Sequence, residues 1–422
     1  MRPLINFLRR VKFYTCGSTD VRVMFKFMGI LILFSKMNFL KPDYNGGSIS
    51  NIYGSILKNF DLNSDRKPLR KSFEKSQKFV LVIFDAFGEK TLERGIEKGF
   101  IDKRLLENFE HETITSIFPS TTACAMLSFY TGLTPGEHGV MGFTTYVKEL
   151  GTIVNMLNLS HPSQEVPLPL IHQNFTKYIS EKAVPIGDML AEKGIKGYSV
   201  IPASIYDTPT NQFYHRGLER VKYYYPWDAF QATRKILQEN ENVFLDLYIP
   251  TVDTLSHHYG PFSPETLSSA SDLLKLLLNS LEGIKGLTLL LTADHGQTDN
   301  TVSHVADDSL MELLEMPPWG DSRAAFMKVK DEEKVRKHFE ENLKGFKLFT
   351  REEYLKEGFL GEYVDPRFQD RLGDILAVPE VPESLIYSYR GPEGDKDYIA
   401  FKGHHGGLTE EEQLVPLLIY RS

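Results

Sequence analysis

The sequence contains few cysteines and no excess of positive charge. Its 422 residues include two cysteines, Cys16 and Cys124. Two cysteines cannot build a disulfide framework, so the cysteine content gives no indication of an oxidising compartment. Lys and Arg number 48 against 56 Asp and Glu, which gives a formal net charge of −8. An acidic chain is poorly suited to stable binding of DNA or RNA, because that affinity depends on neutralising phosphates.

Internal repeats and low-complexity tracts are also missing from the sequence. Hydrophobic residues make up 41% and charged residues 25% of the chain, which are ordinary values for a globular protein. These values exclude disordered, collagen-like and coiled-coil classes. The length corresponds to two or three domains, or to one large α/β domain with insertions.

Residues 1–36 differ in charge from the rest of the chain. They contain seven basic residues and one acid, Asp20. Their longest uncharged run, residues 27–35, has nine residues, whereas a membrane span needs about 20. No small-residue cleavage site follows this run. We expect an N-terminal basic extension upstream of a start at Met37, with a membrane-surface anchor and a disordered tail as alternatives. We accordingly expect a cytoplasmic protein whose membrane association, if any, involves residues 1–36.

Apolar runs alternate with helix-like segments from residue 79 onward. Residues 79–85 (FVLVIFD) and 287–294 (LTLLLTAD) are apolar runs that end in an acid, which is typical of strands buried on both faces. Residues 122–131 and 264–281 are typical of helices. We therefore predict an α/β fold with a mostly parallel central sheet and helices on both faces. Further strands are expected at residues 113–117, 197–201, 242–249, 374–378 and 414–420.

Residues 308–370 follow a different pattern. They predict, in order, a helix, a strand, a charged helix, a strand and a helix. They contain no candidate site residue, so we expect a small inserted α+β subdomain that resembles a cap. The catalytic domain then comprises residues 37–307 and 371–422, with long loops near the mouth of the site at residues 136–185.

Acids, histidines and hydroxyls follow several of the predicted strands. Ligands of open α/β sheets bind beyond the carboxyl ends of strands, which makes these side chains candidates for a site. Asp253 and His257 are four residues apart and would share one face of a helix, as ligands of one metal ion must. The hydroxyls of residues 120–122 open a helix, whose N-terminus favours an anion such as phosphate. The remaining candidates are Asp85, Asp294, His295, His404 and His405.

Three aspartates, three histidines and one hydroxyl together indicate a metal site. Each has an ordinary structural explanation by itself, such as helix capping or a solvated loop. Their shared position at strand ends favours a pair of divalent metal ions with mixed oxygen and nitrogen ligands. Zinc is the preferred metal because imidazole and carboxylate ligands suit it, and manganese is the alternative.

The order of these motifs resembles the alkaline phosphatase superfamily and, within it, the type I phosphodiesterase/nucleotide pyrophosphatase family. Three stretches carry the resemblance: residues 118–143 (FPSTTACAMLSFYTGLTPGEHGVMGF), 253–265 (DTLSHHYGPFSPE) and 292–296 (TADHG). The resemblance implies an alkaline-phosphatase-like fold and a two-metal hydrolase of phosphoric esters. Its substrate would be a small-molecule phosphate ester or diphosphate.

The resemblance also implies a role for each matching residue. Thr122 would be the nucleophile and would form a phosphothreonine intermediate. One metal would be held by Asp85, Asp294 and His295 and would also contact Thr122. The other metal would be held by Asp253, His257 and His405.

One position departs from the family pattern. The family has an asparagine that helps to hold a phosphoryl oxygen where Phe143 follows Gly142 here. Phenylalanine has no hydrogen-bond donor, so either another group replaces it or the substrate differs from a nucleotide diester. The candidate replacements are Thr144, Thr145, His404 and the backbone of Thr122. The substrate-contacting residues expected in this region are Phe143, Thr144 and His404.

Two other functions remain open at this stage. The first is a phosphomonoesterase or phosphomutase of the same superfamily. A mutase would need several Lys or Arg residues to bind a distal phosphate. The second is a non-catalytic binding protein built on this scaffold. The sequence does not indicate an oligomeric state.

Overall fold

The computed structural model describes residues 37–164 and 166–422. The predictions of a basic extension, a membrane-surface anchor and a start at Met37 concern residues 1–36 and fall outside this range. The described part forms one compact unit from Met37 to Ser422.

A seven-stranded sheet forms the centre of this unit, in the order β2-β17-β8-β1-β7-β5-β6. Strand β17 pairs antiparallel with β2 and β8, and the other neighbouring pairs are parallel. The predicted mostly parallel central sheet is therefore confirmed. The strands are β1 (Lys78–Phe84), β2 (Phe109–Thr115), β5 (Lys196–Pro202), β6 (Glu219–Tyr223), β7 (Val243–Ile249), β8 (Leu287–Thr292) and β17 (Leu414–Arg421).

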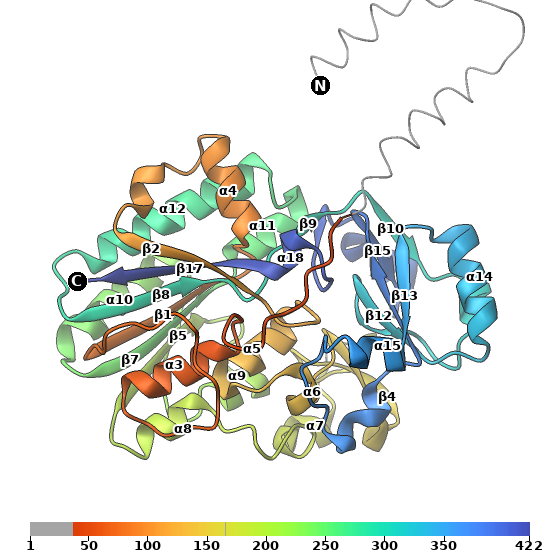
Figure 1. Ribbon diagram of the computed structural model, residues 1–422, viewed down its shortest axis with the longest axis horizontal. Coiled ribbons are helices and arrows are strands. Elements are labelled where there is room, and N and C mark those ends of the chain that lie inside the picture. The colour runs from red at the N-terminus through yellow and green to blue at the C-terminus, as the bar shows by residue number, and fades with distance from the viewer. Residues whose placement is uncertain (1–36, 165) are drawn as a thin grey trace, which may run out of the picture. The chain divides into compact units, whose positions relative to one another are not determined.

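Helices cover both faces of this sheet, as predicted. In Figure 1, α4 (Glu89–Glu97) and α12 (Pro264–Leu281) lie above it, and α3 (Asn51–Asn59) and α8 (Ile186–Ala191) lie below it. Every residue of β7 and β8 is buried. Strands sandwiched between two helical layers have no polar face, which explains why their sequences are mostly apolar.

The three central strands bring distant parts of the sequence to one edge. Strands β8, β1 and β7 are parallel neighbours, so their carboxyl ends lie side by side. Asp85 directly follows β1, and Asp294 follows β8 with one residue between. After β7 the chain enters α11 (Thr251–Tyr259), which carries Asp253 and His257.

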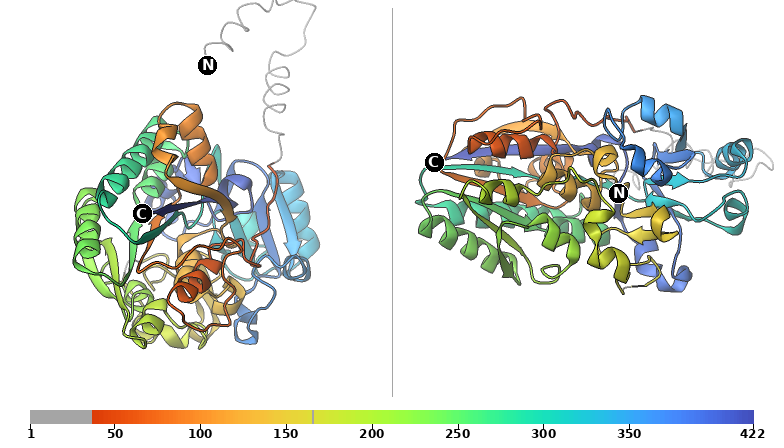
Figure 2. Two further views of the ribbon diagram at one scale, coloured as in Figure 1. Left: turned by 60° about the vertical axis from the view of Figure 1, so that its left-hand side comes forward. Right: turned by 90° about the horizontal axis from the view of Figure 1, so that it is seen from below.

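A second sheet lies beyond this edge (Figures 1 and 2). It has six antiparallel strands in the order β13-β14-β12-β11-β3-β4. Helices α14 (Glu332–Asn342) and α15 (Arg351–Lys356) accompany it. The strands are β3 (Thr144–Val147), β4 (Thr152–Asn155), β11 (Trp319–Asp321), β12 (Ala324–Met327), β13 (Phe346–Thr350) and β14 (Ile375–Pro379).

The second sheet extends beyond the predicted insertion at residues 308–370. That range supplies β11, β12 and β13, whereas β14 follows it and β3 and β4 precede it. The expectation of long loops at residues 136–185 is wrong for β3 and β4. Each of these strands has four residues, too few for a convincing alternation of polar and apolar positions. The role of residues 308–370 as a cap stays a prediction.

A buried ion pair connects the second sheet to the segment that carries His405. Arg323 Nε donates to Glu412 Oε1 at 2.7 Å, and Nη2 donates to Oε2 at 3.1 Å. Both side chains are fully buried. Arg323 Nη1 also donates to the carbonyl oxygens of Val381 and Glu383. A bidentate pair with these extra bonds fixes the relative position of the two segments.

Substitution of Arg323 by methionine should lower the free energy of unfolding by about 3–5 kcal/mol, because it leaves the Glu412 carboxylate buried without its partner. Denaturant-induced unfolding measures this loss. The double variant Arg323→Met/Glu412→Gln is the control, and it should recover part of the lost stability. Equal stabilities of the wild type and Arg323→Met would contradict the assignment.

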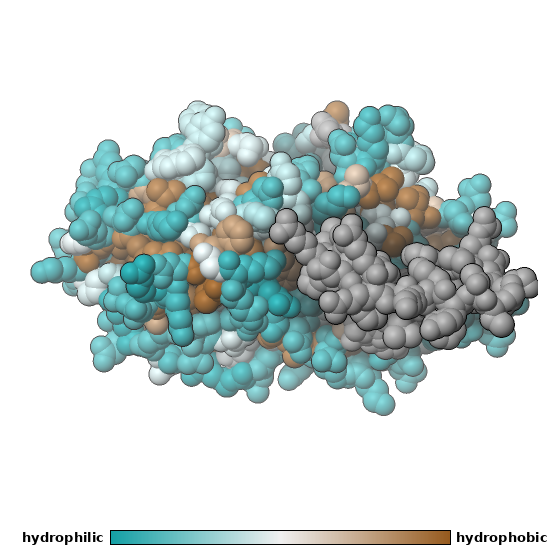
Figure 3. Space-filling view, turned by 90° about the horizontal axis from the view of Figure 1, so that it is seen from above, coloured by the Kyte–Doolittle hydropathy of each residue, from teal (hydrophilic) through white to brown (hydrophobic). Residues whose placement is uncertain are grey.

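Hydrophilic residues cover most of the coloured surface in Figure 3, interrupted by a band of hydrophobic residues. Within residues 37–164 and 166–422, none of the helices has the length and apolar character needed to cross a membrane.

Candidate functional site

Two groups of acids and histidines lie at the carboxyl edge of the central sheet. Asp85, Asp294 and His295 form one group, and all three are buried. Asp253, His257 and His405 form the other, and are partly buried. Within each group the nitrogen and oxygen atoms that could bind a metal lie within 4.8 Å of one another. The structure thus brings all six residues into the two sets that the resemblance implies.

The first group is held by the ends of β1 and β8. The Asp85 backbone N–H donates to the carbonyl of Ile249 at the end of β7. Asp294 Oδ1 accepts the N–H groups of Ala86 at 3.1 Å and His295 at 3.0 Å. His295 Nε2 lies 3.3 Å from Asp294 Oδ2 and 3.6 Å from Asp85 Oδ1.

The second group depends on one face of α11. Asp253 and His257 are one helical turn apart, and His257 Nε2 lies 3.2 Å from Asp253 Oδ1. His405 Nε2, from a segment 152 residues further along than Asp253, lies 3.9 Å from the same oxygen. Gln297 Nε2 donates to Asp253 Oδ1 at 2.5 Å. The predicted sharing of one helix face by Asp253 and His257 is therefore present.

The three histidines all present Nε2 to the site. Nδ1 of His257 lies 2.8 Å from the Gly403 carbonyl, Nδ1 of His405 lies 3.1 Å from the Ser120 carbonyl, and Nδ1 of His295 lies 3.0 Å from the Gly296 carbonyl. A carbonyl oxygen only accepts, so each Nδ1 must carry the proton. Each Nε2 therefore has a lone pair available for a metal when the ring is neutral.

Burial supports this neutral state for two of the histidines. It lowers the pKa of His295 to about 4 and that of His405 to about 4. His257 behaves differently, because Asp253 raises its pKa despite the opposing effect of burial. A metal ion competes with that proton for the same Nε2 atom.

The carboxylates of the first group fit a cation. Burial, together with the neighbouring Asp294, raises the pKa of Asp85 well above its usual range, and burial raises the pKa of Asp294 to about 6. Among the described residues, none supplies a hydrogen bond to Asp85 Oδ1 or Asp294 Oδ2, although both atoms are buried. Unpaired buried carboxylate oxygens are costly. A divalent cation would satisfy both atoms and remove the repulsion between the two carboxylates.

Thr122 lies beside the first group, at the start of α5 (Thr122–Thr131). Its Oγ1 atom is 3.2 Å from His295 Nε2 and 3.5 Å from Asp85 Oδ2. The preceding Thr121 has extended backbone angles and begins the helix, while Ser120 bonds to Gly406 and Gly407. The Thr122 hydroxyl is thus held at a helix N-terminus, which favours an anion.

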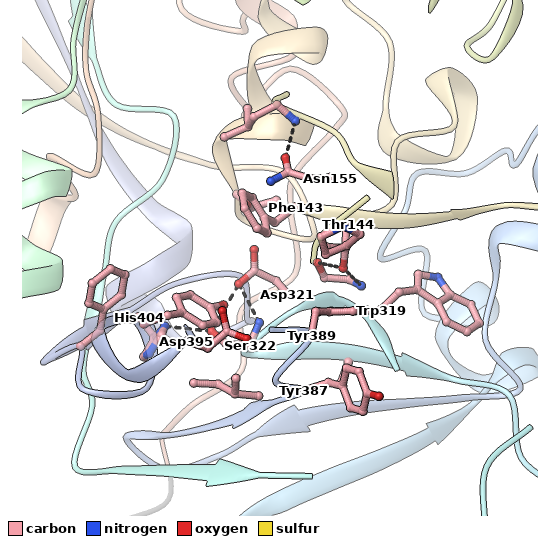
Figure 4. A pocket seen from close by; sticks show the side chains of 18 of the residues that line it. Phe143, Thr144, Asn155, Trp319, Asp321, Ser322, Tyr387, Tyr389, Asp395 and His404 are labelled. Atoms are coloured by element: carbon pink, nitrogen blue, oxygen red, sulfur yellow. Dashed lines mark hydrogen bonds between the residues drawn. The ribbon is translucent and has the colours of Figure 1, made fainter. Parts of the chain in front are cut away.

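A cavity of about 510 Å³ opens beside Thr122, Asp253, His257 and His405. Its wall includes the three predicted substrate contacts Phe143, Thr144 and His404 (Figure 4). The Thr144 hydroxyl donates to the carbonyl of Gly320 and accepts the N–H of the same residue. The hydroxyl proton is already used in the hydrogen bond to Gly320, so Thr144 is poorly placed to donate to a phosphoryl oxygen in place of the missing asparagine.

Several residues of the site were missed by sequence reasoning. The Tyr248 hydroxyl donates to Asp85 Oδ2 from within β7. Gln297 holds Asp253, and Asn155 and Asp321 line the cavity. Tyr248 lies in an apolar strand, and the partners of the other three are distant in sequence. No local pattern could have identified them, apart from a single hydroxyl in the apolar run of β7.

A comparison with models of protein families identifies the family of this chain. The model for type I phosphodiesterase/nucleotide pyrophosphatase matches residues 79–408. The chain belongs to this family. The family is one of phosphodiesterase- and pyrophosphatase-type phosphoryl hydrolases in the alkaline phosphatase superfamily, which confirms the resemblance seen in the sequence. Among curated proteins, none matches the sequence significantly.

Solved structures share the fold. Murine ectonucleotide pyrophosphatase/phosphodiesterase 5 is 18% identical with a TM-score of 0.58, over 82% of this chain and 88% of that chain. Phosphonoacetate hydrolase from Sinorhizobium meliloti, in complex with phosphonoacetate, is 20% identical with a TM-score of 0.60, over 83% and 92% of the two chains. An inactive threonine-to-alanine variant of the murine protein, in complex with AMP, is 18% identical with a TM-score of 0.57, over 81% and 87%. These similarities confirm the alkaline-phosphatase-like fold.

Proposed function

We propose that this family member hydrolyses phosphodiesters or diphosphates with two divalent metal ions and Thr122 as the nucleophile. The observation that carries the proposal is the position of the Thr122 hydroxyl, 3.2 Å from His295 and 3.5 Å from Asp85. A threonine hydroxyl is a weak nucleophile in water and needs activation. A metal ion held by the neighbouring candidate ligands would provide this activation by lowering the pKa of the hydroxyl.

Six residues would hold the metals. Asp85, Asp294 and His295 form the site nearer to Thr122, and Asp253, His257 and His405 form the other. When bound, two divalent cations would lower the pKa of the attacking oxygen and stabilise charge on the leaving oxygen. Zinc is preferred for these mixed imidazole and carboxylate ligands, with manganese as the alternative.

The chain itself positions the reacting groups. Helix α5 fixes Thr122, and its N-terminal N–H groups favour the negatively charged phosphoryl group. In the first step, the Thr122 hydroxyl gives up its proton, Oγ1 bonds to phosphorus, the bond to the leaving oxygen breaks, and the leaving oxygen takes up a proton. In the second step, water bonds to phosphorus, and the bond to Oγ1 breaks, which restores the hydroxyl and releases the phosphate product. The threonine-to-alanine variant of the murine relative is described as inactive, which supports a threonine in this role.

The substrate is proposed to be a small molecule. Relatives with this fold were solved with AMP and with phosphonoacetate, and the cavity of about 510 Å³ has the size of small-molecule sites. A phosphomutase would need a basic cluster for its distal phosphate. Arg390 is the one Lys or Arg among the described residues that line the cavity, and its Nε donates to Asp395 Oδ1 at 2.6 Å. This favours a hydrolase over a mutase.

The proposal is tested by hydrolysis of bis-p-nitrophenyl phosphate. Metal-free protein should be inactive, and addition of zinc or manganese should restore release of p-nitrophenol. Equal turnover with and without a chelator would contradict the two-metal assignment. Absence of turnover after metal loading, together with absence of bound metal, would instead support a non-catalytic protein.

Tyr248 is expected to strengthen metal binding through Asp85. Its hydroxyl donates to Asp85 Oδ2 and so orients this carboxylate. Substitution of Tyr248 by phenylalanine should weaken metal affinity by about 10–100-fold, as is usual when a hydrogen bond to a metal ligand is lost. Competition with a chromogenic chelator measures the affinity. Tyr214→Phe, the same change at another buried tyrosine, is the control, and equal affinities of all three proteins would refute the role.

A further inference from the structure

Asp321 is an acid in the cavity wall that belongs to neither group of candidate metal ligands. It ends β11 and lies opposite Gly406, the neighbour of His405. A Cβ atom on Gly406 would come within 2.7 Å of the Asp321 side chain. The Asp321 side chain therefore packs directly against the segment that carries His405, and it lines the same cavity as Thr122.

Hydrogen bonds hold this carboxylate in place from one side. Asp321 Oδ1 accepts the backbone N–H of Ser322 at 2.8 Å. The Ser322 hydroxyl lies 2.9 Å from His404 Nδ1, so Ser322 connects the acid to the predicted substrate contact His404. Asp321 Oδ2 is shielded from solvent, and within the described part of the chain no hydrogen bond to it meets the usual distance and angle limits. The side chain of Thr121 lies near enough to this carboxylate to lower its pKa.

The charge of Asp321 is not balanced by a nearby basic side chain. In the part of the chain that the structure describes, Lys and Arg form no ion pair with it, and Arg390 of the same cavity is paired with Asp395. Burial raises the pKa of Asp321 above its usual value, and the nearby His405 and His257 oppose this effect. Tyr398 and Cys124 are the other titratable groups near this carboxylate. A substrate bound at Thr122 would thus meet a carboxylate across a partly enclosed space, where charges interact more strongly than in water.

We propose that Asp321 selects substrates by charge, favouring phosphodiesters over phosphomonoesters. The inference rests on the proposed function of the site. A diester phosphate carries one negative charge, whereas a monoester carries close to two at neutral pH. Asp321 lines the same cavity as Thr122 and would repel the second charge of a bound monoester. Arg390, the one Lys or Arg among the described residues that line this cavity, is paired with Asp395 rather than with Asp321. Two bound metal ions would attract both kinds of substrate. The preference for diesters over monoesters would therefore come from the repulsion by Asp321.

The test compares two substrates with the same leaving group, methyl p-nitrophenyl phosphate and p-nitrophenyl phosphate. The wild-type protein, loaded with zinc, should have the higher kcat/KM for the diester. Asp321→Asn removes the charge and keeps the side-chain shape. It should raise kcat/KM for the monoester relative to the diester by about tenfold, the size expected for one unit charge nearby.

Three further variants make the result specific. Asp321→Glu keeps the charge and should keep the diester preference, while Asp321→Ala removes it and provides a second test if the asparagine variant does not fold. Asp397→Asn removes a charge from an exposed position in the wall of the same cavity, and should change the ratio less than Asp321→Asn. An unchanged ratio in Asp321→Asn and Asp321→Ala, or an equal loss on both substrates, would overturn the inference. Metal-dependent turnover that needs Thr122 would still stand in that case, so the two proposals fail separately.

Discussion

Thr122→Ala should lower kcat for bis-p-nitrophenyl phosphate by roughly 10⁴–10⁶-fold, as the loss of a covalent nucleophile does in other hydrolases. The alanine retains the helix start and removes the hydroxyl that lies 3.2 Å from His295 Nε2 and 3.5 Å from Asp85 Oδ2. Water would have to attack in its place without the advantage of a fixed position. Steady-state release of p-nitrophenol measures the loss.

Two observations make this result specific to the nucleophile. Thr131→Ala removes a hydroxyl at the other end of α5, where it donates to the Leu127 carbonyl, and should retain most of the activity. Thr122→Ala should also bind nearly as much metal as the wild type, because the carboxylates and imidazoles of both groups remain. Wild-type turnover in Thr122→Ala would refute the assigned nucleophile.

Asp253→Ala should lower the bound metal from two ions per chain toward one. Asp253 Oδ1 is the atom that His257 and His405 both approach, and His257 lowers the pKa of this acid despite the opposing effect of burial. Its removal leaves two neutral imidazoles, which bind a divalent ion more weakly than a set that includes a carboxylate. Elemental analysis of the dialysed holoprotein measures the stoichiometry.

The control for this experiment is Asp397→Ala, which removes an exposed acid from the wall of the same cavity and should leave two ions bound. A stoichiometry of two in Asp253→Ala would place the second metal elsewhere. A stoichiometry of zero, with an unchanged melting temperature, would mean that the two groups bind metal cooperatively.

The central part of the fold and the candidate residues at the strand ends could be predicted because local sequence determines them, whereas their division into two groups is implied by the family resemblance. A continuous apolar run such as residues 287–292 specifies a doubly buried strand, and an acid at its end must lie at the carboxyl edge of a parallel sheet. Asp253 and His257 share a face because helical periodicity requires it. These features need no knowledge of distant parts of the chain.

The remaining features depend on contacts between distant segments. The contact between Tyr248 and Asp85 depends on the pairing of β1 with β7. In that register Tyr248 lies opposite Ile83, two residues before Asp85. Asp321 meets Gly406 across 85 residues of sequence. Strand β3 becomes evident only through its partner β11, which pairs with Thr144 from a distant position, and β4 joins the sheet by pairing with β3. Tertiary contacts of this kind leave no local sequence pattern.

The stereochemical course at phosphorus tests the two-step account most directly. A chiral phosphorothioate diester would be hydrolysed by the metal-loaded protein in isotopically labelled water, and the configuration of the product determined. Two successive in-line displacements, first by Thr122 Oγ1 and then by water, each invert phosphorus, so we predict overall retention. Overall inversion would mean that water attacks the substrate directly, and would contradict the covalent role of Thr122.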